Sequence, residues 1–307
     1  MSVRRTAPEL VRSASRFGLR FKSFSLVSEG TWTDEDADWN YKDVPHLNQV
    51  HSQADTVPAT IGDDFIATIN FQKIAGIPVP IALANYVASD GTQVYYTTLA
   101  CFVLIVETAI GDSTQSGSIR SRVETTYHIG GPSGAIWLYP ILRRILTANY
   151  KVLMSEDLPM RAQRGRLRLA GYSFASDGRP RTFAETTDLT VKNVIPPTPT
   201  SSHPVTVDLR RLEPEGTVIV GDSTAGFRLI RTADKEVAVF DRVCDHEGAC
   251  LDSAAATRNS LVCPWHAKRV KPLGTIELGV PGVQQLNLRP GCDLVAEGDV
   301  LTFTGMI

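Results

Sequence analysis

The chain of 307 residues is 43% hydrophobic and 21% charged, and its net charge at pH 7 is −2. This composition fits a folded protein of two domains and gives no indication of nucleic-acid binding. Because no run of about 18 apolar residues occurs, the sequence predicts no transmembrane helix.

A basic segment occupies residues 1–30. Its six basic side chains up to Lys22 accompany a single acid, Glu9. Thr6 and Glu9 fit a capping box, and apolar residues follow at helical spacing as far as Phe21. We expect a helix docked on the protein's own body. Contact with a membrane surface and a targeting role are the alternatives.

A histidine pair follows in the pattern Asp43-x2-His46-x4-His51. Two imidazoles and one carboxylate are the usual protein ligands of a non-haem ferrous ion that activates oxygen. Positions five apart on a regular helix point about 140° apart, so the helix must end or distort if both histidines bind one metal. Pro45 fits such an irregular start better than a helix interior. The alternative is an ordinary pair of core or surface histidines.

The next part of the chain predicts a sheet and then a long helix. Strand-like apolar runs cover residues 65–71, 93–110 and 118–128, and a helical stretch runs from Ile136 to about Leu169. A long helix on a curved antiparallel sheet encloses an apolar cavity, as in helix-grip folds. The predicted fold class is therefore α+β, with a helix-grip-like domain at residues 31–193.

A proline-rich stretch marks the domain boundary. Residues 194–204 contain four prolines, which cannot continue a helix or a central strand and predict an extended linker. Short β-branched and apolar runs between turn residues then predict a small all-β domain at residues 205–307. The predicted strands are 205–212, 217–221, 227–231 and 237–243.

Two short cysteine-histidine pairs lie in the predicted all-β domain, Cys244-x-His246 and Cys263-x2-His266. Each pair offers one thiolate and one imidazole. Two loops of this kind can each give one ligand to each iron of a 2Fe-2S cluster in which histidines replace two cysteines. A structural zinc site is the alternative, although zinc fingers usually pair cysteine with cysteine and histidine with histidine.

The neighbouring residues make these loops resemble those of Rieske 2Fe-2S proteins, in their oxygenase and ferredoxin branch. The first loop reads Cys-Asp-His-Glu-Gly-Ala-Cys-Leu from Cys244, and Gly248 allows a tight turn toward the sulfurs. The resemblance implies that Cys244 and Cys263 bind one iron and that His246 and His266 bind the other. The C-terminal domain is then a Rieske 2Fe-2S domain.

Three residues depart from related patterns. In the respiratory branch a disulfide joins the two loops, but here Cys250 is displaced by one position and Trp265 stands where its partner would be. The resemblance therefore implies no such disulfide and a potential low in the Rieske range of about −150 to +300 mV. Ala267 replaces a glycine that is more usual in the family. The five cysteines do not form a secreted framework, so we expect a reducing, cytoplasmic location.

Beside a Rieske cluster, the pattern around His46 and His51 resembles the mononuclear iron motif of Rieske non-haem iron oxygenases. The resemblance implies that both histidines bind Fe(II). It also implies a carboxylate ligand on the later helix, where Asp157 is the better match and Glu156 is the fallback. An acidic pair at a solvated helix start is the alternative for these two residues.

Asp43 has a separate role by the same resemblance. In the family, an aspartate at this position hydrogen-bonds a cluster histidine and an iron-ligand histidine. The partners here would be His266 and His46. The order of the two domains is the reverse of the usual one, and family members commonly form trimers, so the contact can lie within one chain or between chains.

The resemblance implies an oxygenase that uses O2 to oxidise a hydrophobic small molecule. Electrons would come from a ferredoxin or flavoprotein reductase, because the sequence has no Gly-rich nucleotide fingerprint. An electron-transfer protein whose first domain binds a hydrophobic ligand without iron is the competing hypothesis, and a redox sensor is a weaker one.

Overall fold

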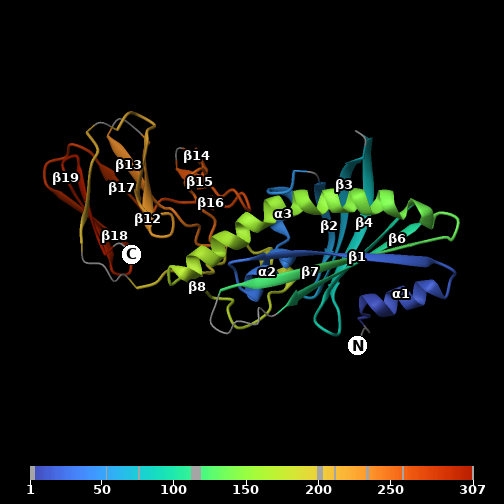
Figure 1. The fold of residues 1–307 in the computed structure, drawn as a ribbon. Helices are drawn as coiled ribbons and strands as arrows, with labels where there is room; N and C mark the ends of the chain where they lie inside the picture. The colour runs from blue at the N-terminus through green and yellow to red at the C-terminus, as the bar shows by residue number, and fades with distance from the viewer. Residues whose placement is uncertain are drawn as a thin grey trace. The chain divides into compact units, whose positions relative to one another are not determined.

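The computed structural model describes residues 4–52, 54–74, 77–111, 119–198, 203–210, 212–232, 235–257 and 259–305. Residues 1–3, 118, 199–202 and 211, which belong to segments predicted above, lie outside this range. The chain divides into two compact units, coloured from blue to red along the sequence in Figure 1. Unit 1 comprises Met1–Gly165 with Ser176–Asp188, and unit 2 comprises Arg166–Ala175 with Leu189–Ile307.

Unit 1 is built on an antiparallel sheet. Among the described residues its strand order is β1-β7-β6-β5-β4-β3-β2. Sequential strands from β2 to β7 are neighbours, and β1 closes the edge beside β7. The strands are β1 (Arg20–Gly30), β2 (Ala54–Ile61), β3 (Phe65–Ile74), β4 (Ile77–Val87), β5 (Gln93–Leu99), β6 (Phe102–Gly111) and β7 (Ser121–Gly131).

One predicted run divides in two. Residues 93–110 form the hairpin of β5 and β6, in which Leu99 pairs with Phe102. Ala100 takes a positive φ of 52° at the turn, a conformation that alanine rarely adopts. The continuous apolar pattern hid this turn, because neither Gly, Asn nor Pro marks it.

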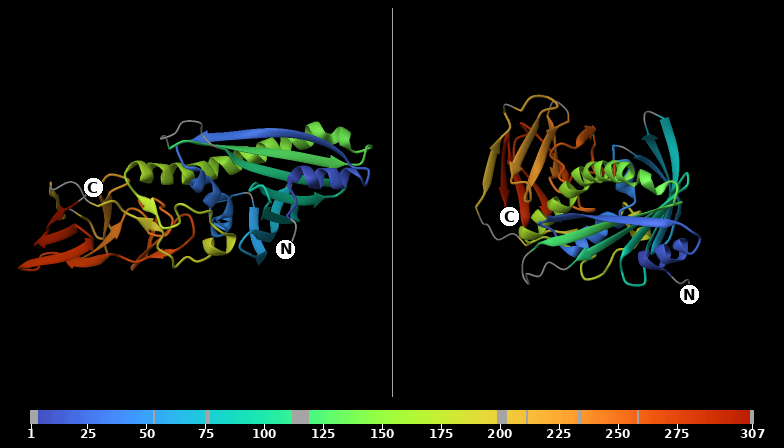
Figure 2. Two further views of the ribbon diagram at one scale, coloured as in Figure 1. Left: turned by 90° about the horizontal axis from the view of Figure 1, so that it is seen from below. Right: turned by 45° about the vertical axis from the view of Figure 1, so that its right-hand side comes forward.

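The long helix α3 (Tyr139–Leu169) follows a short 3-10 turn, η2 (Ile136–Leu138), so the predicted helix from Ile136 to about Leu169 is confirmed. Figure 2 shows the sheet curving around α3. Tyr150 and Met154 of α3 pack against Phe24 and Tyr127 of the sheet. Unit 1 therefore has the predicted helix-grip arrangement.

The basic segment forms α1 (Ala7–Ser15), and Glu9 accepts the Thr6 backbone N–H at 2.9 Å as the capping box requires. Ala7 is fully buried against Val94 and Ile105 of the sheet. The helix is thus docked on its own domain. The helix ends at Ser15, earlier than the predicted pattern, because Phe21 belongs to strand β1 and pairs with Gly130. Phe17, between the two elements, is 89% exposed.

In the described part of unit 2, the last residues of α3 are the only helical ones, and the other regular elements are strands. Its described strands form two four-stranded antiparallel sheets, β10-β20-β19-β18 and β11-β12-β13-β17, with smaller sheets β14-β15-β16 and β8-β9. Their bounds are β8 (Ser173–Phe174), β9 (Val194–Ile195), β10 (Val205–Asp208), β11 (Thr217–Gly221), β12 (Gly226–Arg231), β13 (Glu236–Asp241), β14 (Ala255–Thr257), β15 (Ser260–Val262), β16 (Arg269–Val270), β17 (Gly274–Glu277), β18 (Val283–Arg289), β19 (Cys292–Glu297) and β20 (Val300–Thr304).

The core of unit 2 explains where β10 ends. Phe227 and Phe303 stack with ring centroids 5.3 Å apart at its centre. Leu209 and Leu212 leave the strand to enter this core, so β10 stops at Asp208 and is shorter than the predicted 205–212. Across the described part of the chain, α3 included, no helix is long and apolar enough to cross a membrane.

Candidate metal centres

The histidine pair of unit 1 lies on a helix end. Helix α2 (Asp34–Lys42) stops before Asp43, and the 3-10 helix η1 (Pro45–Asn48) follows at once. His46 belongs to η1, and His51 comes after its end. Pro45 has no backbone N–H to donate, so α2 cannot continue through it and a 3-10 helix begins there instead. This change of helix type is the distortion that the spacing of the two histidines predicts.

The loop between the histidines is fixed to the sheet. The Asn48 side chain donates to the Thr56 carbonyl at 2.7 Å and accepts the Thr56 N–H at 2.6 Å. This pair of hydrogen bonds ties the end of η1 to strand β2. The two imidazole rings are consequently held with their centroids 4.9 Å apart.

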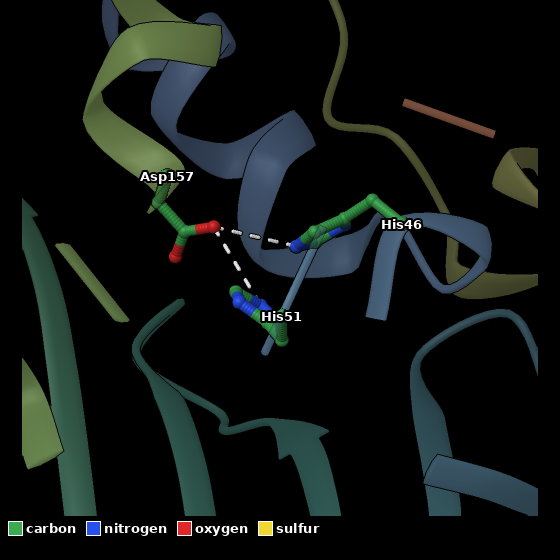
Figure 3. Close-up of side chains that lie close together, drawn as sticks. All are labelled: His46, His51 and Asp157. Carbon is green, nitrogen blue, oxygen red and sulfur yellow. Dashed lines mark ion pairs between the residues drawn. The ribbon is translucent and has the colours of Figure 1, made fainter. Parts of the chain in front are cut away.

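Asp157, on α3, completes a cluster with the two histidines. Its Oδ1 lies 3.4 Å from His46 Nε2 and 3.6 Å from His51 Nε2. One ligand atom from each side chain falls within 4.8 Å of the others. Figure 3 shows the three side chains pointing toward one another. The acidic pair lies within α3, so the alternative of a solvated helix start is wrong.

Carboxylates also face the outer nitrogen of each imidazole. His51 Nδ1 lies 3.0 Å from Glu156 Oε2, and Glu156 also accepts the N–H and hydroxyl of Ser52. His46 Nδ1 faces Asp43 Oδ2 at 3.4 Å. A carboxylate on Nδ1 fixes the tautomer that leaves the Nε2 lone pair toward the cluster centre. Asp157, rather than Glu156, therefore faces both Nε2 atoms.

The charges of the cluster favour a cation. Burial lowers the pKa of His46, but the close carboxylates of Asp157 and Asp43 outweigh burial and raise this pKa to about 10. Burial raises the pKa of Asp157, whereas His46 and the Arg161 charge bring it below its ordinary value. Asp157 Oδ1 is buried and makes no hydrogen bond of ordinary geometry with the described residues. Two imidazoles and one such carboxylate fit a divalent metal.

Sequence reasoning missed the residues that join α2 to α3. Arg164 donates to Asp36 at 2.8 Å, and Arg161 donates to Asn40 at 2.7 Å, all four side chains being buried. Asp36 and Asn40 are four residues apart and so lie on one face of α2, next to the apolar residues Ala37 and Trp39. This spacing is the sequence signal that could have predicted buried polar partners for them. These contacts set the distance between the histidine loop and Asp157.

A cavity of about 690 Å³ opens beside the cluster. His46, His51 and Asp157 line one part of it, and Leu99 and Ile145 line another. Most of the remaining lining surface is apolar, and polar side chains interrupt it, namely nine Asn and Thr residues, four tyrosines, Lys42 and Asp43. The volume suits a small organic molecule.

The cysteine-histidine pairs of unit 2 lie in two loops with the same backbone pattern. In the first, Gly248 N–H donates to Cys244 O at 3.0 Å and Cys244 N–H donates to Ala249 O at 2.9 Å. In the second, Ala267 N–H donates to Cys263 O at 2.9 Å, and Cys263 N–H donates to the following residue's carbonyl at 2.9 Å. The two cysteines therefore hold equivalent positions in their loops, whereas His246 follows its cysteine by two residues and His266 by three.

The four predicted cluster ligands converge. Their side chains are at most 4% exposed. His246 Nδ1 and His266 Nδ1 lie 3.1 Å apart, near the roughly 3.3 Å expected for two imidazole nitrogens on one tetrahedral metal. A hydrogen bond between the two thiols lowers the pKa of Cys263 to about 7 and raises that of Cys244. The two sulfurs and two nitrogens form the mixed donor set that a Rieske cluster uses.

Residues 205–289 match the family model described as the Rieske [2Fe-2S] domain. The C-terminal unit carries a Rieske domain. This finding implies a 2Fe-2S cluster and an electron-transfer function. Gly248 takes a positive φ of 90° and donates its N–H to the Cys244 carbonyl, so it lies in the predicted tight turn. None of the five cysteines is in a disulfide.

The comparison with curated proteins found no match to this chain. Among solved structures, the Zhui aromatase/cyclase from Streptomyces sp. R1128 is 9% identical, with a TM-score of 0.41, over 47% of this chain and 96% of that one. A START superfamily protein from Mycobacterium smegmatis is 11% identical, with a TM-score of 0.36, over 45% of this chain and 98% of that one.

Proposed function

We propose that this chain is a Rieske-type oxygenase, in which the 2Fe-2S cluster feeds electrons to a mononuclear iron held by His46, His51 and Asp157. The observation that supports the proposal is the convergence of these three side chains beside an apolar cavity in a chain that also carries a Rieske domain. Bound iron would supply oxygen activation, which no amino-acid side chain provides.

The chain's own residues would position the reactants. The Nε2 atoms of His46 and His51 and one oxygen of Asp157 would bind the metal on one side and leave its other side open to the cavity. Asp43 and Glu156 would hold the imidazoles in the ligating tautomer. The cavity would keep an apolar substrate next to the metal and exclude bulk water.

The reaction needs an external electron donor. Incorporating one oxygen atom of O2 into a substrate while the other leaves as water consumes two electrons and two protons. A cluster of this type delivers one electron at a time, so a ferredoxin or flavoprotein reductase would have to reduce it twice.

The competing hypothesis is an electron-transfer protein whose unit 1 binds a hydrophobic molecule without iron. The size and apolar walls of the cavity suit this function equally well. The two hypotheses differ in the metal content of unit 1, because only the oxygenase requires a third iron.

Iron stoichiometry after anaerobic reconstitution decides between them. We expect three irons per chain in the natural protein and two in the His46→Ala/His51→Ala variant, with the visible spectrum of the cluster unchanged. His203→Ala is the matched control, because it removes a histidine from unit 2 that is not a predicted ligand. Two irons in all three proteins would contradict the proposal.

A further inference from the structure

The cavity mouth is apolar and exposed. Leu99 and Ile145 line the cavity, and they are 40% and 56% exposed, respectively. The cavity therefore reaches the surface between the β5–β6 turn and the first turns of α3. Two further apolar side chains, Trp137 and Ile141, precede Ile145 at helical spacing and are 68% and 53% exposed.

Phe17 lies at the same end of the sheet. It precedes strand β1, whose first residue Arg20 pairs with Gly131 at the end of β7. Leu99 and Phe102 flank the turn at this end of the β5–β6 hairpin. Figure 1 shows the end of α1 and the start of α3 at this end of the sheet, on opposite sides of it. We call the exposed apolar residues Phe17, Leu99, Trp137, Ile141 and Ile145 the mouth surface.

The charge around the mouth surface has one sign. Residues 10–28 and 132–155 contain seven basic residues and no aspartate or glutamate, although the whole chain has a net charge of −2. Arg16, Arg20, Arg143 and Arg144 are all exposed. Exposed aromatic and aliphatic side chains surrounded by cations are typical of proteins that lie on anionic bilayers.

We propose that the mouth surface docks on an anionic lipid bilayer, so that an apolar ligand passes between the membrane and the cavity without crossing water. The basic side chains would bind lipid headgroups, while Trp137 and its apolar neighbours would enter the interface. The proposal goes beyond the oxidation proposed above and does not depend on iron.

Trp137 makes the test specific. The other three tryptophans, Trp32, Trp39 and Trp265, are at most 9% exposed. Holoprotein is mixed with vesicles of phosphatidylcholine alone or with added phosphatidylglycerol, and binding is followed by co-sedimentation. Brominated lipid in the same vesicles should quench the Trp137 fluorescence. We expect binding and quenching with the anionic vesicles only, and a loss of both as salt concentration rises.

Paired variants complete the experiment. Arg143→Gln/Arg144→Gln should weaken vesicle partitioning about 25-fold, at roughly fivefold for each charge. Lys235→Gln/Lys271→Gln removes two exposed charges from unit 2 and should leave partitioning unchanged. The His46→Ala/His51→Ala variant should bind vesicles normally, which separates this proposal from the oxygenase. Equal binding by the two charge variants, or no binding to either vesicle, would overturn the proposal.

Discussion

At the scale of single residues, the two loops that carry the predicted cluster ligands differ at the fourth residue after the cysteine, which is glycine in one loop and alanine in the other. Gly248 and Ala267 each follow a cluster cysteine by four residues, and each takes a positive φ, of 90° and 52°. An alanine in the left-handed region costs about 1–2 kcal/mol relative to ordinary backbone, whereas glycine has no such cost. Ala267, the departure from the family pattern, is therefore a strained position.

Ala267→Gly should stabilise the cluster loop. Removal of the strain exceeds the entropy that glycine adds to the unfolded chain, so we expect a net gain of about 0.5–1 kcal/mol. The measurement is the temperature at which the visible absorbance of the cluster disappears. Ala255→Gly, at an exposed strand position with negative φ, is the control and should lower this temperature.

Glu156 and its neighbour Asp157 contact different atoms of the histidines: Glu156 contacts Nδ1 of His51, whereas Asp157 faces the Nε2 atoms of both histidines. Glu156→Ala should weaken Fe(II) binding in unit 1 by about 10–100-fold, because the His51 imidazole loses the partner that orients it. Titration against a chelator measures the affinity, and the cluster spectrum reports intact folding of unit 2. Glu29→Ala, at an exposed strand position, should bind iron normally; an unchanged affinity in Glu156→Ala would show that His51 needs no such partner.

At the scale of secondary-structure elements, the distance between the histidine loop and Asp157 depends on how α2 packs on α3. Asp36 and Arg164 form a buried ion pair, and the Arg164 guanidinium also lies 4.4 Å from the Trp39 ring. A buried charge that loses its partner is much more costly than an exposed one. This ion pair is therefore a structural support for the candidate iron site.

Asp36→Ala should destabilise unit 1 by about 3–5 kcal/mol, since it leaves the Arg164 charge buried without its carboxylate. Thermal unfolding followed by circular dichroism measures the effect. Glu35→Ala changes an exposed acid in the same turn of α2 and should shift the transition only slightly. If both variants melt alike, Arg164 has sufficient support from its other contacts.

The elements also show what the sequence could predict. Apolar runs located α3 and the part of the sheet that contains β3, β5, β6 and β7, whereas β1, β2 and β4 were not predicted. The His46, His51 and Asp157 cluster was predicted from a motif and then from family resemblance. The turn at Ala100 was not predicted, because no Gly, Asn or Pro marks it. The pairs Asp36–Arg164 and Asn40–Arg161 were not predicted, because each joins side chains more than 120 residues apart in the sequence.

At the scale of the whole molecule, the proposed reaction requires electrons to pass from one metal centre to the other. Asp43 is buried beside His46, with Oδ2 facing His46 Nδ1 at 3.4 Å. Its predicted second partner, His266, belongs to unit 2, so this contact stays a prediction. If it forms, within a chain or between the subunits of an oligomer, the carboxylate links the two metal centres.

With excess Fe(II) to offset the weaker binding expected when His46 loses its carboxylate partner, Asp43→Ala should keep three irons per chain but slow electron transfer about 10–100-fold, because the hydrogen-bonded link between the imidazoles is lost. Fully reduced protein is mixed with oxygen, and cluster reoxidation is followed by its visible absorbance. The His46→Ala/His51→Ala variant gives the rate of direct reoxidation without the mononuclear iron. Asp43→Ala should fall to this rate, and Asp43→Asn, which retains one acceptor oxygen, should be intermediate. An iron-dependent phase of natural speed in Asp43→Ala would mean that electrons reach the mononuclear iron by a route that does not use this carboxylate.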